Sequence, residues 1–151
     1  MKIRAINISV FELPANSGLF QMEETGQGAR KRWARRSAGK STEHVHVLHV
    51  KTDEGIEGVC TVGDARYTTM RRDDLEQLRL LAVGEDPFER ERLAQKLHKA
   101  TRGMFTRPGW FGAFDNCLWD IAGKAADLPV HGLIGRARSN CPAYYNFKSS
   151  S

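Results

Sequence analysis

The sequence lacks the features that mark several classes of protein. No stretch approaches the roughly 18 consecutive apolar residues of a membrane-spanning helix, and the N-terminus has no apolar core of a signal peptide. Its three cysteines, Cys60, Cys117 and Cys141, are odd in number and far apart, so they form neither a disulfide framework nor a CxxC pair. We interpret them as reduced thiols and expect a cytoplasmic protein that does not enter a membrane.

The composition is that of an ordinary globular chain with one basic segment. Of 151 residues, 40% are hydrophobic and 27% are charged, which is enough for one domain to bury a core. The net charge is +5, yet residues 30–40 alone contain six basic residues, no acidic residue, and Trp33. Such a segment could be a solvated loop, a lid that meets an anionic small molecule, or a nucleic-acid contact. We favour the first two.

The first half of the chain has the alternating pattern of strands. Every second residue is apolar in 3–11, which predicts a half-buried strand that Pro14 ends. Residues 43–51 and 56–62 predict two more strands, joined by a turn at 53–55, so we expect an antiparallel sheet. Residues 14–41 show no sustained period and predict a long loop, either a functional lid or disordered.

The second half has the period of helices. A first helix is predicted to end at Gly84, and a second to begin at Pro87 behind an Asp86 cap. A third is expected from about Trp110 to Ala126, followed by a short turn of helix over 129–134. Because the strands precede the helices, the pattern predicts an α+β domain with a three-stranded antiparallel sheet followed by a helical bundle.

Two motifs suggest binding sites that their surroundings do not support. Residues 39–41 read GKS, but Ala34 stands where a phosphate-binding loop has glycine, and a strand follows instead of a helix. His44 and His46 would share one face of a strand, with His49 nearby, and this spacing can hold zinc. No cysteine or acid at ligand spacing completes the set, so we favour ordinary strand histidines. The acids are scattered, and no residue is predicted to be catalytic or to bind a metal.

One segment carries a specific resemblance. Residues 115–124 read DNCLWDIAGK, and four residues later 129–135 read PVHGLIG. This resembles the N-terminal signature of the mandelate racemase/muconate lactonizing enzyme group of the enolase superfamily, with Cys117 where alanine is usual and Ile134 where leucine is common. Within it, Asp120 and Lys124 form an i,i+4 pair, and Gly123 would allow a close approach. The predicted elements over residues 1 to about 147 also follow the order of that group.

The resemblance implies an enolase-type capping domain over residues 1–135. Residues 136–151 would then be a linker and the start of a truncated (β/α)-barrel, with 143–147 as the first barrel strand. The resemblance also implies an isomerase or lyase that uses magnesium to remove the proton α to a carboxylate, as a racemase, cycloisomerase or acid-sugar dehydratase. The base and the metal ligands of that group lie in the barrel and have no counterpart here. We therefore expect no cofactor in this chain, no turnover by it alone, and magnesium in the full-length enzyme.

The resemblance assigns this chain a lid role. The two lid loops would lie at about 14–42 and 63–69, and the basic first loop suits an acidic small-molecule substrate. The lid candidates are Phe20, Met22, Arg30, Arg32, Arg66 and Tyr67. The missing barrel is an expected partner, and so is a second copy of the chain, because aromatic residues near the C-terminus would otherwise be exposed. The alternative is a stand-alone, non-catalytic module that binds a protein partner or an anion.

Overall fold

Over the residues that it describes, the computed structural model has five strands followed by four helices, the order expected for an α+β domain. It describes residues 1–15, 20–26, 28, 32–37, 41–62, 70, 72–101, 110–140 and 142. The strands are β1 (Ile3–Ala15), β2 (Phe20–Thr25), β3 (Arg32–Ser37), β4 (Ser41–Thr52) and β5 (Glu57–Val62). The helices are α1 (Arg72–Ala82), α2 (Arg90–Thr101), α3 (Trp110–Ala126) and α4 (Val130–Leu133). In this part of the chain no helix is both long and apolar enough to cross a membrane.

The predicted three-stranded sheet is confirmed. Its order is β1-β4-β5, and both pairs are antiparallel. The turn between β4 and β5 holds Gly55 at a φ of 85°, a conformation that favours glycine. Thr52 closes this turn, because its hydroxyl donates to the carbonyl of Ile56 and accepts from the Ile56 amide.

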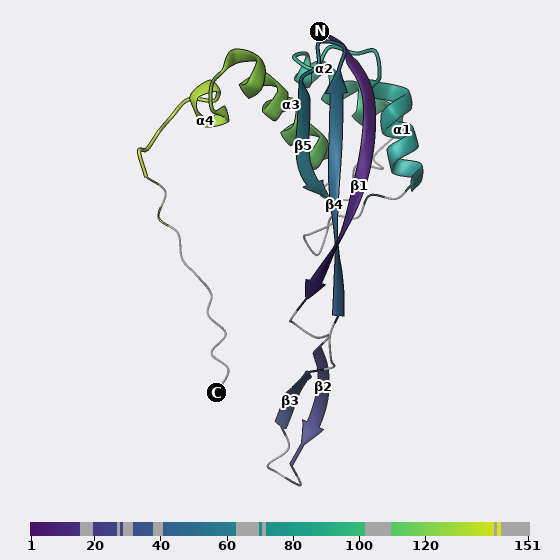
Figure 1. Cartoon of the computed structure of the whole chain (residues 1–151), viewed down its shortest axis with the longest axis vertical. Helices are drawn as coiled ribbons and strands as arrows, with labels where there is room; N and C mark the ends of the chain where they lie inside the picture. The colour runs from purple at the N-terminus through teal and green to yellow at the C-terminus, as the bar shows by residue number, and fades with distance from the viewer. Residues whose placement is uncertain are drawn as a thin grey trace.

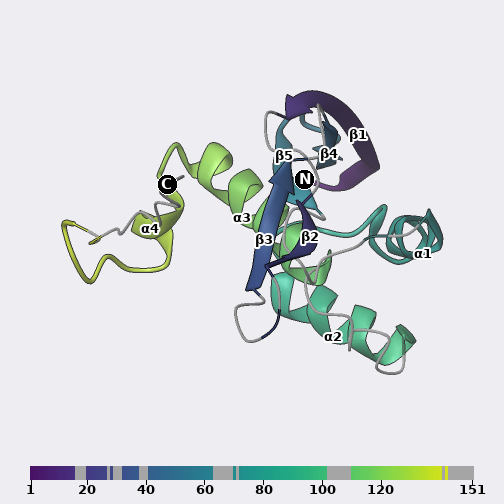
Figure 2. The ribbon, with the colours of Figure 1, turned by 90° about the horizontal axis from the view of Figure 1, so that it is seen from below.

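Helices cover one face of this sheet. Figures 1 and 2 show α1, α2 and α3 together behind β1, β4 and β5, while the opposite face has no helix against it. The core lies between the two layers, and every member of the buried cluster is at most 6% exposed. The sheet contributes Ile3, Ile6, Leu48, Val50 and Val62, and the helices contribute Leu78, Ala82, Leu93, Leu97, Ala113, Phe114, Cys117, Leu118 and Ile121.

The predicted long loop over 14–41 is corrected by the structure. β1 continues through Pro14 to Ala15, and β2 and β3 form a separate two-stranded ribbon. Pro14 is tolerated because β1 is an edge strand, so a missing N–H can face away from β4. The ribbon lies beyond the far end of β1 and β4, away from the core (Figure 1). Because it does not pack on the core, its sequence does not need the alternating apolar residues of a half-buried strand.

The start of the second helix is also corrected. α2 begins at Arg90, whereas Pro87 was the predicted first residue. The carboxylate of Asp86 accepts from the Phe88 amide at 2.9 Å, and the Asp86 carbonyl accepts from the Glu89 amide. These bonds make a turn before the helix, and Pro87 is buried in it. The end of α1 before Gly84 and the range of α3 are confirmed. The predicted barrel strand at 143–147 lies outside the described residues.

Candidate functional site

The lid candidates fall partly on the ribbon of β2 and β3. Phe20 begins β2, Met22 lies within it, and Arg32 begins β3. The antiparallel register pairs Met22 with Arg35 and Arg32 with Thr25. The structure therefore brings these three candidates into one small ribbon. Arg30, Arg66 and Tyr67 lie outside the described residues, so their roles stay predictions.

An arm carries this ribbon away from the domain body. β1 and β4 pair continuously up to Ala15 and Ser41, whereas β5 stops pairing with β4 where His46 meets Val62. The outer part of β1 and β4 is consequently two-stranded, and Figure 1 shows it projecting past the helices with the ribbon at its far end. We call the pairs from Phe11 with Val45 to Ala15 with Ser41 the arm. It holds β2 and β3 at a distance from the core (Figure 1).

The ribbon concentrates basic residues without acids directly across from them. The arginines of β3, at positions 32, 35 and 36, pair in register with Thr25, Met22 and Gln21. The two acids of β2, Glu23 and Glu24, pair with Ala34 and Trp33 instead. Directly opposed charges are the cross-strand pairs that neutralise one another best. The register therefore places no acid directly opposite any of the three arginines.

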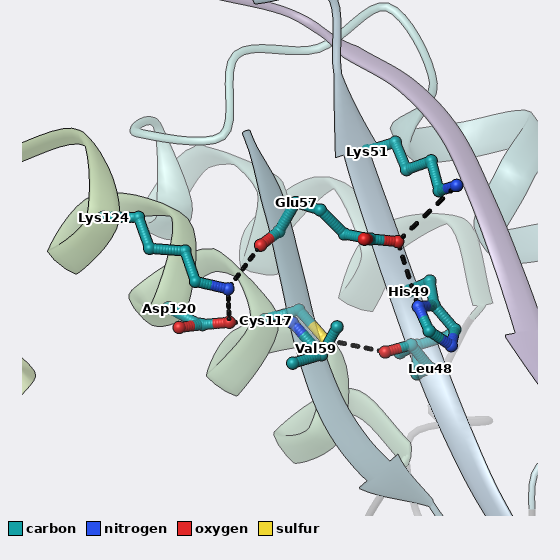
Figure 3. Close-up of polar contacts among 8 residues, drawn as sticks. All are labelled: Leu48, His49, Lys51, Glu57, Val59, Cys117, Asp120 and Lys124. Carbon is teal, nitrogen blue, oxygen red and sulfur yellow. Dashed lines mark hydrogen bonds and ion pairs between the residues drawn. The ribbon is translucent and has the colours of Figure 1, made fainter. Parts of the chain in front are cut away.

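The signature residues Asp120 and Lys124 fasten α3 to an edge of the sheet (Figure 3). The Asp120 carboxylate accepts from the Val59 amide at 2.9 Å and from the Lys124 ammonium at 2.7 Å. Lys124 also donates to the Glu57 carbonyl at 2.7 Å. Exposed edge groups of this kind can pair with other chains, and the two side chains occupy two of them on β5. The i,i+4 spacing predicted their pairing, but no sequence signal identified the strand that they bind.

Gly58 and Cys117 mark the closest approach of α3 to β5. A Cβ atom on Gly58 would lie 2.1 Å from the Cys117 carbonyl oxygen and 2.9 Å from Cγ1 of Ile121. The Cys117 side chain is fully buried, with Sγ 3.7 Å from the Leu48 carbonyl oxygen. Burial raises the pKa of the Cys117 thiol far above its ordinary value, which keeps it neutral. Cys117 is thus a core residue and not a nucleophile.

The other acid of the signature, Asp115, holds the start of α2. The Arg90 guanidinium donates to both Asp115 carboxylate oxygens, with Nη2 2.8 Å from each. The same guanidinium lies 3.7 Å from the ring centroid of Trp119, in cation–π geometry. The polar and aromatic side chains of the signature therefore dock α3 on α2 and β5, and none of these contacts leaves a group poised for chemistry.

Two of the three histidines of β4 lie beside separate acids. His49 Nδ1 is 3.0 Å from Glu57 Oε1, and the same carboxylate lies 3.7 Å from the Lys51 ammonium (Figure 3). His44 Nε2 lies 3.5 Å from Glu12 Oε1. Within the described ranges, no three side chains from histidine, cysteine, aspartate or glutamate are grouped to hold a metal ion.

Comparisons with known proteins agree with the signature. A family model described as the N-terminal domain of mandelate racemase/muconate lactonizing enzyme matches residues 30–135. The cis-3-hydroxy-L-proline dehydratase of Roseibium aggregatum is 28% identical over 151 aligned positions, which take in 96% of this chain and 37% of that enzyme. The D-mannonate dehydratase of a Sphingomonas species is 37% identical over 100 residues, covering 60% of this chain and 23% of the relative.

Solved structures share the fold. The D-glucarate dehydratase of Agrobacterium tumefaciens, complexed with magnesium, superposes with a TM-score of 0.64 and 25% identity, over 89% of this chain and 33% of that one. This chain thus spans between 23% and 37% of the length of these relatives. The matching region takes in β3 to α4 and the whole signature. The chain belongs to the mandelate racemase/muconate lactonizing enzyme family of the enolase superfamily, whose N-terminal domain it contains.

Proposed function

We propose that this chain is the substrate-capping domain of an acid-sugar dehydratase whose full-length form removes the proton α to a carboxylate with the help of magnesium. Residues 1–135 form the cap, and 136–151 lead into the barrel. The observation that carries the proposal is the arm, which holds a ribbon with arginines at positions 32, 35 and 36 beyond the body of a domain of this family. Relatives that are named as dehydratases support the choice of reaction.

The described residues do not fit a magnesium centre, since no three potential ligands are grouped among them. We therefore assign no step of the elimination to them. The cap's contribution is to bind and enclose the substrate. A guanidinium group can hold a carboxylate through two parallel hydrogen bonds, and a closed site strengthens every electrostatic contact inside it by excluding water. A two-stranded arm has few buried contacts to lose, so it suits a lid that opens and closes.

A chimera tests this proposal directly. Residues 1–135 would replace the matching N-terminal domain of the Sphingomonas D-mannonate dehydratase, and dehydration of D-mannonate and related acid sugars would be measured with magnesium. We expect the chimera to turn over an acid sugar and the isolated 151-residue chain to turn over none. Turnover by the isolated chain would overturn the capping role, and so would a chimera that folds but does not react with any acid sugar.

The basic ribbon is tested within the same chimera. Replacing Arg32 and Arg35 together by glutamine should lower kcat/KM by about 10- to 100-fold, because charge-assisted hydrogen bonds contribute about 1.5–3 kcal/mol. Arg4→Gln is the matched control, since Arg4 is exposed on the domain body. Equal activity of the ribbon variant and the control would show that the ribbon does not meet the substrate.

A further inference from the structure

In the domain body, residues outside the three-stranded sheet bind backbone groups at both of its edges. At the β5 edge, Asp120 and Lys124 bind the backbone. At the β1 edge, the Ile3 amide donates to the Glu85 carbonyl, and the Ile3 carbonyl accepts from the Gly84 amide. Arg79 Nε donates to the Ile6 carbonyl at 2.7 Å. These contacts occupy several of the backbone groups with which another strand could pair.

Farther along β1 the same edge is open. Because the Ile6 carbonyl points away from β4, the alternation of an antiparallel ladder directs the backbone groups of Ile8, Val10 and Glu12 away from β4 as well. Among the described residues, no hydrogen bond reaches the outward groups of these three. The side chains here are apolar and half exposed: Val10 is 54% exposed, Phe11 51% and Leu13 48%. An unpaired edge with apolar side chains is a template for another strand.

We propose that a second copy of this chain pairs with this edge, antiparallel, about a twofold axis at Val10. Each β1 would place Val10 opposite Val10 of the second copy and Ile8 opposite its Glu12. The two sheets would join into one with the order β5-β4-β1-β1-β4-β5. This inference is independent of the proposed function, because it uses only the β1 edge of the chain itself.

The hydrogen-bonding groups of the edge select this register. With the axis at Val10, Ile6 faces Pro14 of the second copy. Pro14 has no N–H to donate, and the Ile6 carbonyl is already bound by Arg79, so neither group loses a partner. An axis nearer the N-terminus, at Ile8 or Ser9, would aim a free amide at that occupied carbonyl.

An axis nearer the C-terminus would leave a backbone carbonyl without a hydrogen-bond donor. Placed at Phe11 or Glu12, it would set Pro14 against an outward carbonyl of Ile8 or Val10, which would then lack a donor. An axis at Glu12 would also oppose two like charges, which is unfavourable in a cross-strand pair. Val10 is the position that avoids both conflicts, and it puts two valines, which favour strands, at the centre of the pair.

Sedimentation equilibrium of the purified chain tests the inference. We expect a concentration-dependent dimer and, for Val10→Lys, a dimer dissociation constant at least about tenfold higher, a change of about 1.4 kcal/mol. Leu128→Lys is the matched control, because Leu128 is 51% exposed and lies after α3. Circular dichroism verifies that both variants fold. A monomer at every concentration would overturn the proposal, as would equal effects of the two substitutions.

A cross-link tests the register even if Val10→Lys impairs folding. Paired residues in an antiparallel ladder have Cα atoms about 5.5 Å apart, within the reach of a disulfide. With a mild thiol oxidant, Val10→Cys should therefore give a disulfide-linked dimer on non-reducing electrophoresis. The unmodified chain, which has its own three cysteines, and Leu128→Cys give the background. A dimer band no stronger than this background would contradict the axis at Val10.

Discussion

The two ends of the β1–β4 pair show how one strand pair can serve both folding and binding. Near the chain's N-terminus one face of the pair lies against the helical layer (Figure 2), and Ile6, Leu48 and Val50 are at most 1% exposed. In the arm the same two strands have no third strand, and Phe11 and Leu13 are about half exposed. The body is held by burial and the arm mainly by backbone pairing. Substitutions in the body should therefore change mainly the free energy of unfolding, and substitutions in the arm and the ribbon should change mainly substrate binding.

The largest expected effect comes from a pair of phenylalanines. Phe114→Ala should destabilise the chain by about 3–5 kcal/mol, because Phe114 is fully buried and its loss leaves a cavity. Phe11→Ala should cost at most about 1 kcal/mol, since much of that side chain already meets water. Urea unfolding followed by circular dichroism measures both. Equal losses would mean that the arm is as much a part of the core as the body.

Two glycines of the body should respond oppositely to substitution by alanine. Gly58→Ala should cost about 2–3 kcal/mol, because the new Cβ would lie 2.1 Å from the Cys117 carbonyl oxygen and push α3 away from β5. Gly112→Ala is the control in α3, where nothing lies within 4 Å of the new atom. There we expect about 0.5–1 kcal/mol of stabilisation. The same urea titration distinguishes them, and a neutral Gly58→Ala would refute the close approach.

Loss of the contacts that Asp120 makes at the β5 edge should destabilise the chain less than Gly58→Ala does. Asp120→Asn weakens the acceptor for the Val59 amide and removes the ion pair with Lys124, so we expect a loss of about 1 kcal/mol. The β5 edge should also open more often, which hydrogen exchange at the Val59 amide would report. Asp127→Asn is a control, because Asp127 is exposed beyond the end of α3. Unchanged exchange at Val59 would show that the carboxylate does not protect the edge.

The smallest expected effect depends on pH. The hydrogen bond from Lys96, followed by the charges of Lys96 and Arg92, lowers the pKa of Glu85 from its ordinary value of 4.5. The contribution of the Glu85 carboxylate to stability is therefore complete above its unfolded-state pKa, and it is lost as the pH falls through the lower folded-state pKa. Glu85→Gln should lower the free energy of unfolding by less than about 1 kcal/mol at neutral pH. It should also make that free energy fall less steeply as the pH is lowered. Glu91→Gln is the control, and an identical acid limb in all three proteins would contradict the assignment.

The body was the part that the sequence predicted well. Its apolar residues recur with the period of the element that buries them, as Leu118 and Ile121 do in α3, so the three strands, α1 and α3 followed from the pattern. The signature at 115–135 identified the family. What it could not reveal was the target of Asp120 and Lys124, because the β5 backbone lies about sixty residues away in the chain.

The ribbon of β2 and β3, together with the end of the arm at Pro14, was the part that the sequence predicted poorly. A two-stranded ribbon beyond the core needs no apolar alternation, so β2 and β3 left no period to detect between positions 14 and 41. Pro14 was interpreted as the end of a strand, but at an edge it interrupts no ladder bond. The lid candidates were chosen by residue type and by their position in the two expected lid loops. Register alone brought Phe20, Met22 and Arg32 into one ribbon, and register cannot be read from charged residues without a buried face.

The most direct test of this division of roles is kcat/KM of the chimera after the ribbon is removed. Residues 16–40 would be replaced by Asn-Gly, since Ala15 and Ser41 are paired and a two-residue turn can join them. We expect the free energy of unfolding to change by at most about 1 kcal/mol and kcat/KM for the acid sugar to fall at least about 100-fold through loss of the lid. A variant that folds and keeps its full kcat/KM would contradict the account.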